Sequence, residues 1–137
     1  MRGERVVFDT NVVISALLFP TSKPAHALER AIATGQLIAT SATVRELVAK
    51  LVSPKFDRYV SRPHRDALLS RLAFFIEVVD VVEQIRASRD PGDDKFLEAA
   101  VHGNADVIVT GDRDLLELHP SRGIAILSPA AYLANLR

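Results

Sequence analysis

Short, mostly apolar runs alternate along this chain with segments in which apolar residues recur at helical spacing. The apolar runs are rich in β-branched residues and occupy residues 6–8, 37–40, 78–82, 107–110 and 124–127. A strand with little polar alternation is covered on both faces, because an open face would need a polar side chain at every second position. The pattern predicts an α/β fold: a three-layer α/β/α sandwich around a mainly parallel sheet, formed by residues 1–137 as a single domain.

Local signals predict where two functionally interesting helices begin. Thr43 and Glu46 match a capping box, with helical apolar spacing behind them that stops at Pro54. The segment 90–93, Asp-Pro-Gly-Asp, is typical of a turn, and an amphipathic helix follows it. These signals place Glu46 and Asp94 each in the first turn of a helix.

Composition excludes several classes of protein. The chain has no cysteine, so disulfides and thiolate metal sites are ruled out. Its apolar runs are broken by charge or proline and do not approach the ~20 residues that a membrane span needs. The first apolar run, residues 6–8, is too short for a secretory signal. We expect a soluble, cytoplasmic protein without membrane association.

The net charge is zero, but the charges are segregated along the chain. Residues 45–71 hold seven basic and three acidic residues, whereas residues 90–117 hold eight acidic and two basic ones. Acids packed closely repel one another unless a cation lies among them, and a divalent ion is a compact solution. The alternative interpretation is that each segment is a solvated face of the protein.

Several acids follow strands of the predicted sheet. Asp9 ends the first strand, and Asp112 and Asp114 follow the run at 107–110. Ligands of an open parallel sheet bind beyond the carboxyl ends of its strands, so these acids are expected to converge there with Glu46 and Asp94. Carboxylates are hard oxygen ligands that suit Mg²⁺ or Mn²⁺.

Most of these acids also have a structural explanation. Glu46 fits the capping box without a metal, and Asp93 and Asp94 favour a helix N-terminus electrostatically. Asp114 fits an ordinary loop position. Asp9 is harder to explain in this way, because an acid between a buried strand and an apolar helix is poorly solvated unless it is paired or liganded. The set as a whole favours a shared site.

Four segments, in order, resemble the acidic elements of the PIN domain. Residues 6–12 (VVFDTNV) resemble its opening motif, a hydrophobic strand that ends in Asp-Thr-Asn. Residues 41–46 resemble the second element, 94–100 (DKFLEAA) the third and 109–115 (VTGDRDL) the fourth. One such motif is weak, but four in the family's order span nearly the whole chain. The sequence is similar to the PIN-family toxin ribonucleases, related to the VapC type, of prokaryotic toxin-antitoxin pairs.

This resemblance implies an Mg²⁺- or Mn²⁺-dependent endoribonuclease that cleaves single-stranded RNA, forms homodimers and is inhibited by an antitoxin. The catalytic metal ligands that it implies are Asp9, Glu46, Asp94 and Asp112, with Asp114 as a further acid and Thr10, Asn11 and Thr110 as positioning groups. Asp93 is an alternative to Asp94. Gly111 and Asp112 stand where many relatives have a basic residue and Asn, so Asp112 either binds the ion or holds a group that does.

The basic stretch offers candidates for RNA binding. They are Arg45, Lys50, Lys55, Arg58 and Arg62, with Phe56 and Tyr59 available to stack on unpaired bases. Phe56 equally suits the core, and the same charges suit an acidic antitoxin. The two uses can coincide, because an antitoxin that occupies the RNA groove needs the same basic residues as the RNA.

Other families with similar chemistry fit less well. A haloacid-dehalogenase-like phosphatase needs a second Asp two residues after the first, where this chain has Asn11. The phosphoacceptor Asp of a receiver domain is not evident, and the chain has no glycine-rich phosphate loop of the P-loop kind. The main alternative is a non-catalytic PIN-like module that binds RNA or protein. The complete set of acids argues against it.

Overall fold

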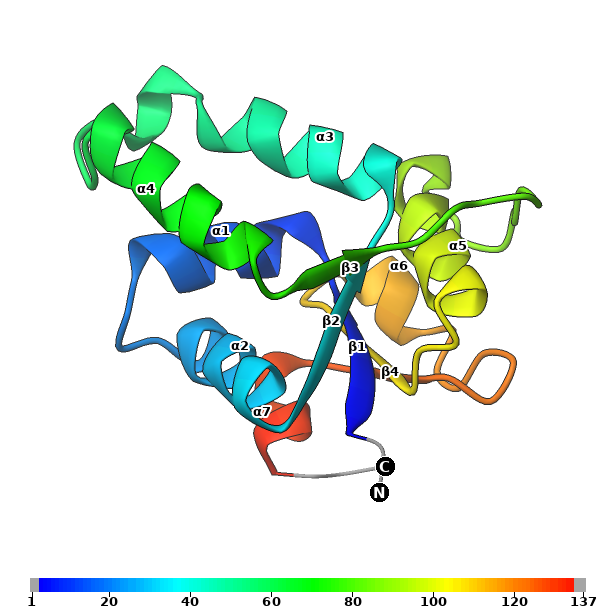
Figure 1. The fold of residues 1–137 in the computed structure, drawn as a ribbon. Helices are drawn as coiled ribbons and strands as arrows, with labels where there is room; N and C mark the ends of the chain where they lie inside the picture. The colour runs from blue at the N-terminus through cyan, green and yellow to red at the C-terminus, as the bar shows by residue number, and fades with distance from the viewer. Residues whose placement is uncertain (1–2, 135–137) are drawn as a thin grey trace.

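A computed structural model describes residues 3–134 and has one five-stranded sheet at its centre (Figure 1). The strands lie in the order β3-β2-β1-β4-β5, and all four neighbouring pairs are parallel. Their bounds are β1 Glu4–Phe8, β2 Gly35–Ala39, β3 Ile76–Val78, β4 Val107–Val109 and β5 Ala125–Leu127. The α/β sandwich expected from the sequence is confirmed.

Helices cover both faces of this sheet. They are α1 Thr10–Leu18, α2 Lys23–Thr34, α3 Ser41–Leu51, α4 Arg62–Ala73, α5 Asp94–His102, α6 Arg113–Leu116 and α7 Pro129–Leu133, with 3₁₀ turns η1 Pro54–Phe56 and η2 Pro91–Asp93. Val6 and Phe8 of β1 pack among side chains from α1, α2, α3 and α7, whereas Val7 packs against α5 and α6. Alternate residues of one strand therefore enter two separate cores, which explains why the strands are apolar throughout.

The third strand differs from the prediction. The apolar run at 78–82 does not form a strand of that length; β3 begins earlier, at Ile76, and ends at Val78. Val81 and Val82 are 38% and 88% exposed. β3 lies at the edge of the sheet and pairs with β2 alone. An edge position leaves apolar residues free to be exposed, so the apolar composition of residues 78–82 is a poor guide to the bounds of this strand.

The start of α3 also differs from the prediction. Thr40 is the N-cap. Its hydroxyl oxygen accepts the backbone N–H of Thr43 at 3.2 Å, and the hydroxyl oxygen of Thr43 accepts the backbone N–H of Thr40 at 2.9 Å. The capping box is therefore Thr40 with Thr43, and Glu46 lies in the second turn. Because Thr43 closes the box, capping does not account for Glu46.

The sequence also predicts a short C-terminal helix over residues 129–136, after the apolar run at 124–127, and α7 begins at Pro129 as predicted. The helix α7 ends at Leu133, and the remainder of the predicted helix, up to residue 136, extends beyond the described residues. Within residues 3–134, no helix combines the length and the apolar character needed to cross a bilayer.

Candidate metal centre

Asp9 lies at the junction of β1 and α1. As the N-cap of α1, its Oδ1 accepts the backbone N–H of Val12 at 3.0 Å. Its Oδ2 accepts the hydroxyl hydrogen of Thr110, which follows β4, the neighbour of β1 in the sheet. Asp9 is only 5% exposed and Thr110 is fully buried. A buried carboxylate is thus held in a fixed orientation at the carboxyl end of the sheet.

Three further carboxylates converge near this point. Asp93 ends the turn η2, and Asp112 and Asp114 lie at the start of α6. One oxygen from each can be chosen so that all three lie within 4.8 Å of one another, and all three residues are half-buried. Thr110 connects the cluster to Asp9, because its hydroxyl oxygen accepts the backbone N–H of Asp112 at 3.0 Å.

The carboxylate of Asp93 lies where a nearby positive charge would stabilise its ionised form. Burial, followed by the charge of Asp112, a hydrogen bond with its side chain, and the charges of Asp90 and Asp9, raises the pKa of Asp93 to about 6. Its Oδ2 is buried, and no hydrogen-bond partner for it is present among residues 3–134. A divalent cation with hard oxygen ligands would satisfy that oxygen and offset the repulsion among the carboxylates, so the residues present fit Mg²⁺ or Mn²⁺.

Asp94, which the sequence favoured over Asp93, has a different environment. Its Oδ1 accepts the backbone N–H groups of Ala87 and Ser88 at 3.1 and 2.7 Å. The carboxylate of Asp94 is therefore turned toward the loop between β3 and α5. Of these two adjacent acids, the structure brings Asp93 to Asp112 and Asp114.

Asp94 is one of three side chains of α5 that hold this loop. Glu98 accepts the N–H of Ile85 at 2.9 Å, and His102 accepts that of Glu83 at 3.2 Å through Nε2. Residues 94, 98 and 102 are spaced by four, which places them on one face of the helix. The polar spacing of four along α5 is the sequence signal that identifies this role, which the motif comparison missed.

Glu46 is near the site but is engaged by other side chains. Its Oε2 accepts the hydroxyl hydrogen of Thr10, and its Oε1 lies 3.0 Å from Nζ of Lys95 and 3.7 Å from Nζ of Lys50. Burial favours a higher pKa for Glu46, but the hydrogen bonds from Thr10 and Lys95 and the charges of both lysines hold it below its usual value. Glu46 is therefore an ionised acid that already has cationic partners.

The structure brings together only part of the predicted RNA-binding set. Lys50, Lys55 and Phe56 line a groove of about 540 Å³ between α1 and α3, together with Asn11. Asn11 is exposed and lies in the first turn of α1, two residues after Asp9, so this groove reaches the helix end that Asp9 caps.

The other basic candidates lie apart from this groove. Arg45 lines a different hollow, with Thr40 and residues 79–84. Arg58 stacks on the ring of Tyr59 at 4.9 Å and donates to its hydroxyl oxygen. Arg62 pairs with Asp66 at 3.2 Å on the exposed surface of α4. Of the five basic candidates, only Lys50 and Lys55 therefore line this groove.

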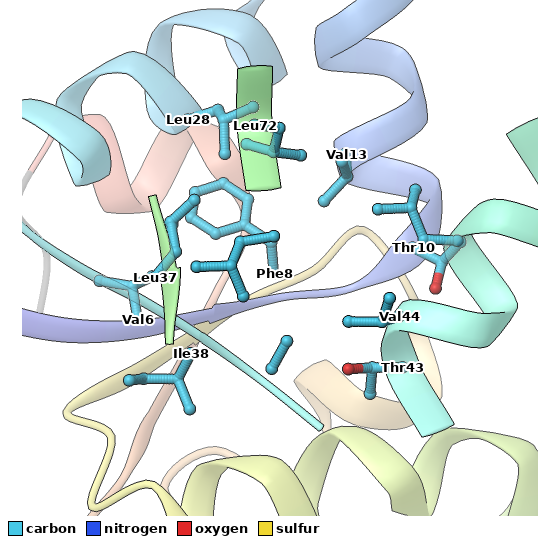
Figure 2. A pocket seen from close by; sticks show the side chains of 13 residues that line it. Val6, Phe8, Thr10, Val13, Leu28, Leu37, Ile38, Thr43, Val44 and Leu72 are labelled. Atoms are coloured by element: carbon cyan, nitrogen blue, oxygen red, sulfur yellow. The ribbon is translucent and has the colours of Figure 1, made fainter. Parts of the chain in front are cut away.

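A small cavity lies inside the core, behind the site. It has a volume of about 40 Å³, is partly open, and is lined by side chains of β1, β2, β3 and the surrounding helices (Figure 2). Thr10 and Thr43 are its polar lining residues, and the rest of the lining is apolar. With no charged lining residue, it is a packing gap and not part of the acidic site.

An α/β/α domain with clustered carboxylates at the carboxyl edge of a parallel sheet is the class that this fold and site define. Residues 5–114 match the family model of the PIN domain, and the chain belongs to this family. It is 34% identical, over 118 residues, to the uncharacterized protein MJ1680 of Methanocaldococcus jannaschii, covering 83% of this chain and 74% of that protein.

A solved structure shares the fold. It is a chain of VapBC2 from Rickettsia felis, in a crystal structure with a DNA fragment from the promoter, at a TM-score of 0.61. The alignment covers 89% of this chain and 96% of that one at 12% sequence identity.

Proposed function

We propose that this PIN-domain protein is a metal-dependent endoribonuclease that hydrolyses phosphodiester bonds of single-stranded RNA. The observation that carries the proposal is the cluster of Asp93, Asp112 and Asp114, in which a buried oxygen of Asp93 has no partner among the described residues. Membership of the PIN-domain family supports it, as does the position of the cluster at the carboxyl edge of the sheet, where ligands of such folds bind.

Asp93, Asp112 and Asp114 would hold Mg²⁺ or Mn²⁺, with Asp9 beside them. A bound ion of this kind lowers the pKa of a water molecule and stabilises charge that develops on a phosphate. Thr110 keeps the site in place by holding Asp9 through its hydroxyl hydrogen and the start of α6 through its oxygen. Asp93 enters this proposed ligand set in place of Asp94, whose Oδ1 holds the loop.

The RNA strand would lie in the groove lined by Lys50, Lys55 and Phe56. Lys55 is available there for a phosphate, whereas the ammonium of Lys50 lies 3.7 Å from Glu46. Phe56 packs partly against the core and also lines the groove, where its ring would meet a base. Lys55 lies 5.1 Å from the centre of that ring, so the cation and the aromatic face are presented together. Asn11 at the near end of the groove would orient the phosphate that approaches the acids.

A cleavage assay tests this proposal. Wild-type protein is incubated with a fluorescently labelled single-stranded RNA in Mg²⁺, in Mn²⁺ and in EDTA, alongside Asp93→Asn and Asp9→Asn. We expect metal-dependent cleavage by the wild type and a loss of about 100-fold or more in both variants, because each removes a charge from the metal site. Equal cleavage by wild type and Asp9→Asn would contradict the assignment of the site.

The same assay separates the enzyme from a non-catalytic module. RNA that is bound but not cut by the wild type in either metal would favour a PIN-like binding protein. An electrophoretic mobility shift on the same RNA supplies that second measurement.

We further propose that the chain is the toxin of a toxin-antitoxin pair and meets its RNA and its antitoxin in the cytoplasm. The shared fold with a chain of VapBC2 supports this proposal. A short reading frame beside the coding sequence, whose product relieves growth arrest when both are expressed, is the expected result. Growth unaffected by expression of the wild-type chain alone would contradict it.

A homodimer is also proposed, and exposed apolar side chains support a protein contact. Phe74 and Val82 are 89% and 88% exposed, and Val78 on the edge strand β3 is 55% exposed. Large exposed apolar groups of this kind mark interaction surfaces. Light scattering after size-exclusion chromatography should give twice the chain mass for the wild type and the single chain mass for Phe74→Ser with Val82→Ser.

A further inference from the structure

The carboxylate of Glu46 is held on both of its oxygens. Thr10 donates to Oε2, and the ammonium group of Lys95 contacts Oε1 at 3.0 Å, with that of Lys50 at 3.7 Å from the same oxygen. Glu46 and Lys95 have side chains that are only 23% and 24% exposed. This contact is therefore partly shielded from water, which strengthens it relative to an exposed ion pair.

Lys95 is itself fixed in position. Its Nζ also donates to the carbonyl oxygen of Gly92, in the turn η2 that carries Asp93. Its ammonium lies 5.5 Å from the centre of the Phe96 ring. The positive charge is thus bound between α3 and η2, and it links the helix that carries Glu46 to the turn that carries Asp93.

A divalent ion bound by Glu46 would compete with this ammonium group. The ion would need Oε1, which Lys95 holds, or Oε2, which accepts from Thr10. A divalent ion and an ammonium group at one carboxylate repel each other, so each weakens the binding of the other there. Asp93, Asp112 and Asp114 lie close together, and within residues 3–134 none of the three forms an ion pair with a lysine or arginine.

We infer that Lys95 takes the place of a second metal ion, so that the chain binds one divalent ion at Asp93, Asp112 and Asp114 and Glu46 positions Lys95 instead of binding metal. This inference rests on the proposed function. In sites with two metals the second cation offsets negative charge on the phosphate, and here a lysine supplies that charge from the protein. Thr10 then orients Glu46, and Glu46 orients Lys95.

Counting bound Mn²⁺ by electron paramagnetic resonance and calorimetry, with no RNA present, tests the inference. The wild type is expected to bind one Mn²⁺ per chain, and Lys95→Met is expected to bind two, because removal of the ammonium exposes Glu46 to a second ion. Lys95→Met combined with Glu46→Gln should return to one, and so should Lys95→Arg. Circular dichroism confirms that each variant is folded.

Glu46→Gln alone provides a second measurement that does not depend on the folding of the Lys95 variants. Its Mn²⁺ affinity should stay within about twofold of wild type, whereas loss of a true ligand or of a group holding one costs about 10-fold or more. A fall of that size would overturn the inference, as would two ions in the wild type or one ion in Lys95→Met.

The count also separates this inference from the proposal on which it rests. No bound Mn²⁺ in the wild type would overturn the metal centre and the role of Lys95 together. One bound ion in a protein that cuts no RNA would contradict the nuclease activity while supporting the assignment of Lys95.

Discussion

Thr110 donates its hydroxyl hydrogen to Oδ2 of Asp9, a residue 101 positions earlier in the chain. The same hydroxyl oxygen accepts the backbone N–H of Asp112. One buried threonine therefore joins the end of β1 to the segment that starts α6. These two contacts fix Asp9 relative to Asp112.

Replacing Thr110 by valine keeps the shape of the side chain and removes both contacts. We expect the Mn²⁺ affinity to fall by about 10-fold, because Asp9 loses the donor that orients it. Calorimetric titration measures this, and Thr110→Ser, which keeps the hydroxyl, is the matched control. An unchanged affinity in Thr110→Val would show that this clamp has no part in metal binding.

The adjacent acids Asp93 and Asp94 should respond differently to the same change. Asp93→Asn is expected to abolish Mn²⁺ binding because it removes a ligand charge from the cluster. Asp94→Asn keeps an oxygen that can accept from Ala87 and Ser88, so it should retain binding within about threefold, as expected of a hydrogen-bonding role.

Asp94→Ala completes this comparison. It removes the acceptor and should loosen residues 83–88, which hydrogen exchange of their backbone amides would detect as faster exchange. If Asp94→Asn lost Mn²⁺ binding as fully as Asp93→Asn, Asp94 would be a ligand after all.

The metal-free protein should lose stability as the pH rises. The pKa of Asp93 is about 6 in the folded protein against an ordinary 3.8, so the folded state binds more protons between these values. The contribution of Asp93 to the free energy of unfolding is therefore fully present below about pH 4 and is lost as the pH rises through about 6. We expect a decrease on the order of 1 kcal/mol, since water still reaches these half-buried carboxylates.

Urea unfolding in EDTA from about pH 5 to about pH 8 measures this effect. Asp93→Asn should flatten the profile and be more stable than the wild type at the upper end, because the repulsion is gone. Saturating Mn²⁺ should reverse the trend for the wild type. A metal-free wild type that gains stability over this range would contradict the assignment of the raised pKa.

Arg65 belongs to the basic stretch of the sequence, yet its side chain is 1% exposed. It donates to the carbonyl oxygens of Leu51 and Ser53 at 3.0 and 2.9 Å and pairs with Asp57. Arg65→Met leaves these acceptors unpaired and should cost about 2–4 kcal/mol of unfolding free energy. Arg62→Met is the control, because its exposed pair with Asp66 should contribute under about 1 kcal/mol.

RNA binding should depend on Lys55 and much less on Arg62. Lys55 lines the groove beside Asn11, whereas Arg62 lies on α4 and pairs with Asp66. Lys55→Gln is expected to lower the affinity for single-stranded RNA and to reduce the slope of log affinity against log salt by about 0.7, the value for one phosphate contact. Fluorescence anisotropy at several salt concentrations measures both, and an equal loss in Arg62→Gln would contradict this path.

Local sequence was enough to predict the central strands of the sheet and the acids at its edge, but not the bounds of the edge strand β3. Residues 6–8 and 107–110 are mostly apolar and β-branched, which predicts β1 and β4; Asp9 follows the first run directly and Asp112 follows the second after Gly111. Parallel strands in one sheet end at a common edge, so the convergence of these two acids followed from the pattern.

The choice among neighbouring acids and the partners of the charged groups depended on tertiary structure. Adjacent residues at a helix start point about 100° apart, so the turn η2 decided that Asp93 faces the cluster and Asp94 the loop. The contact of Lys95 with Glu46 joins residues 49 positions apart. The periodicity of a segment indicates which side of its own helix or strand a residue occupies. Which charged group Lys95 or Glu46 contacts on that side is set by the packing of α3 against α5.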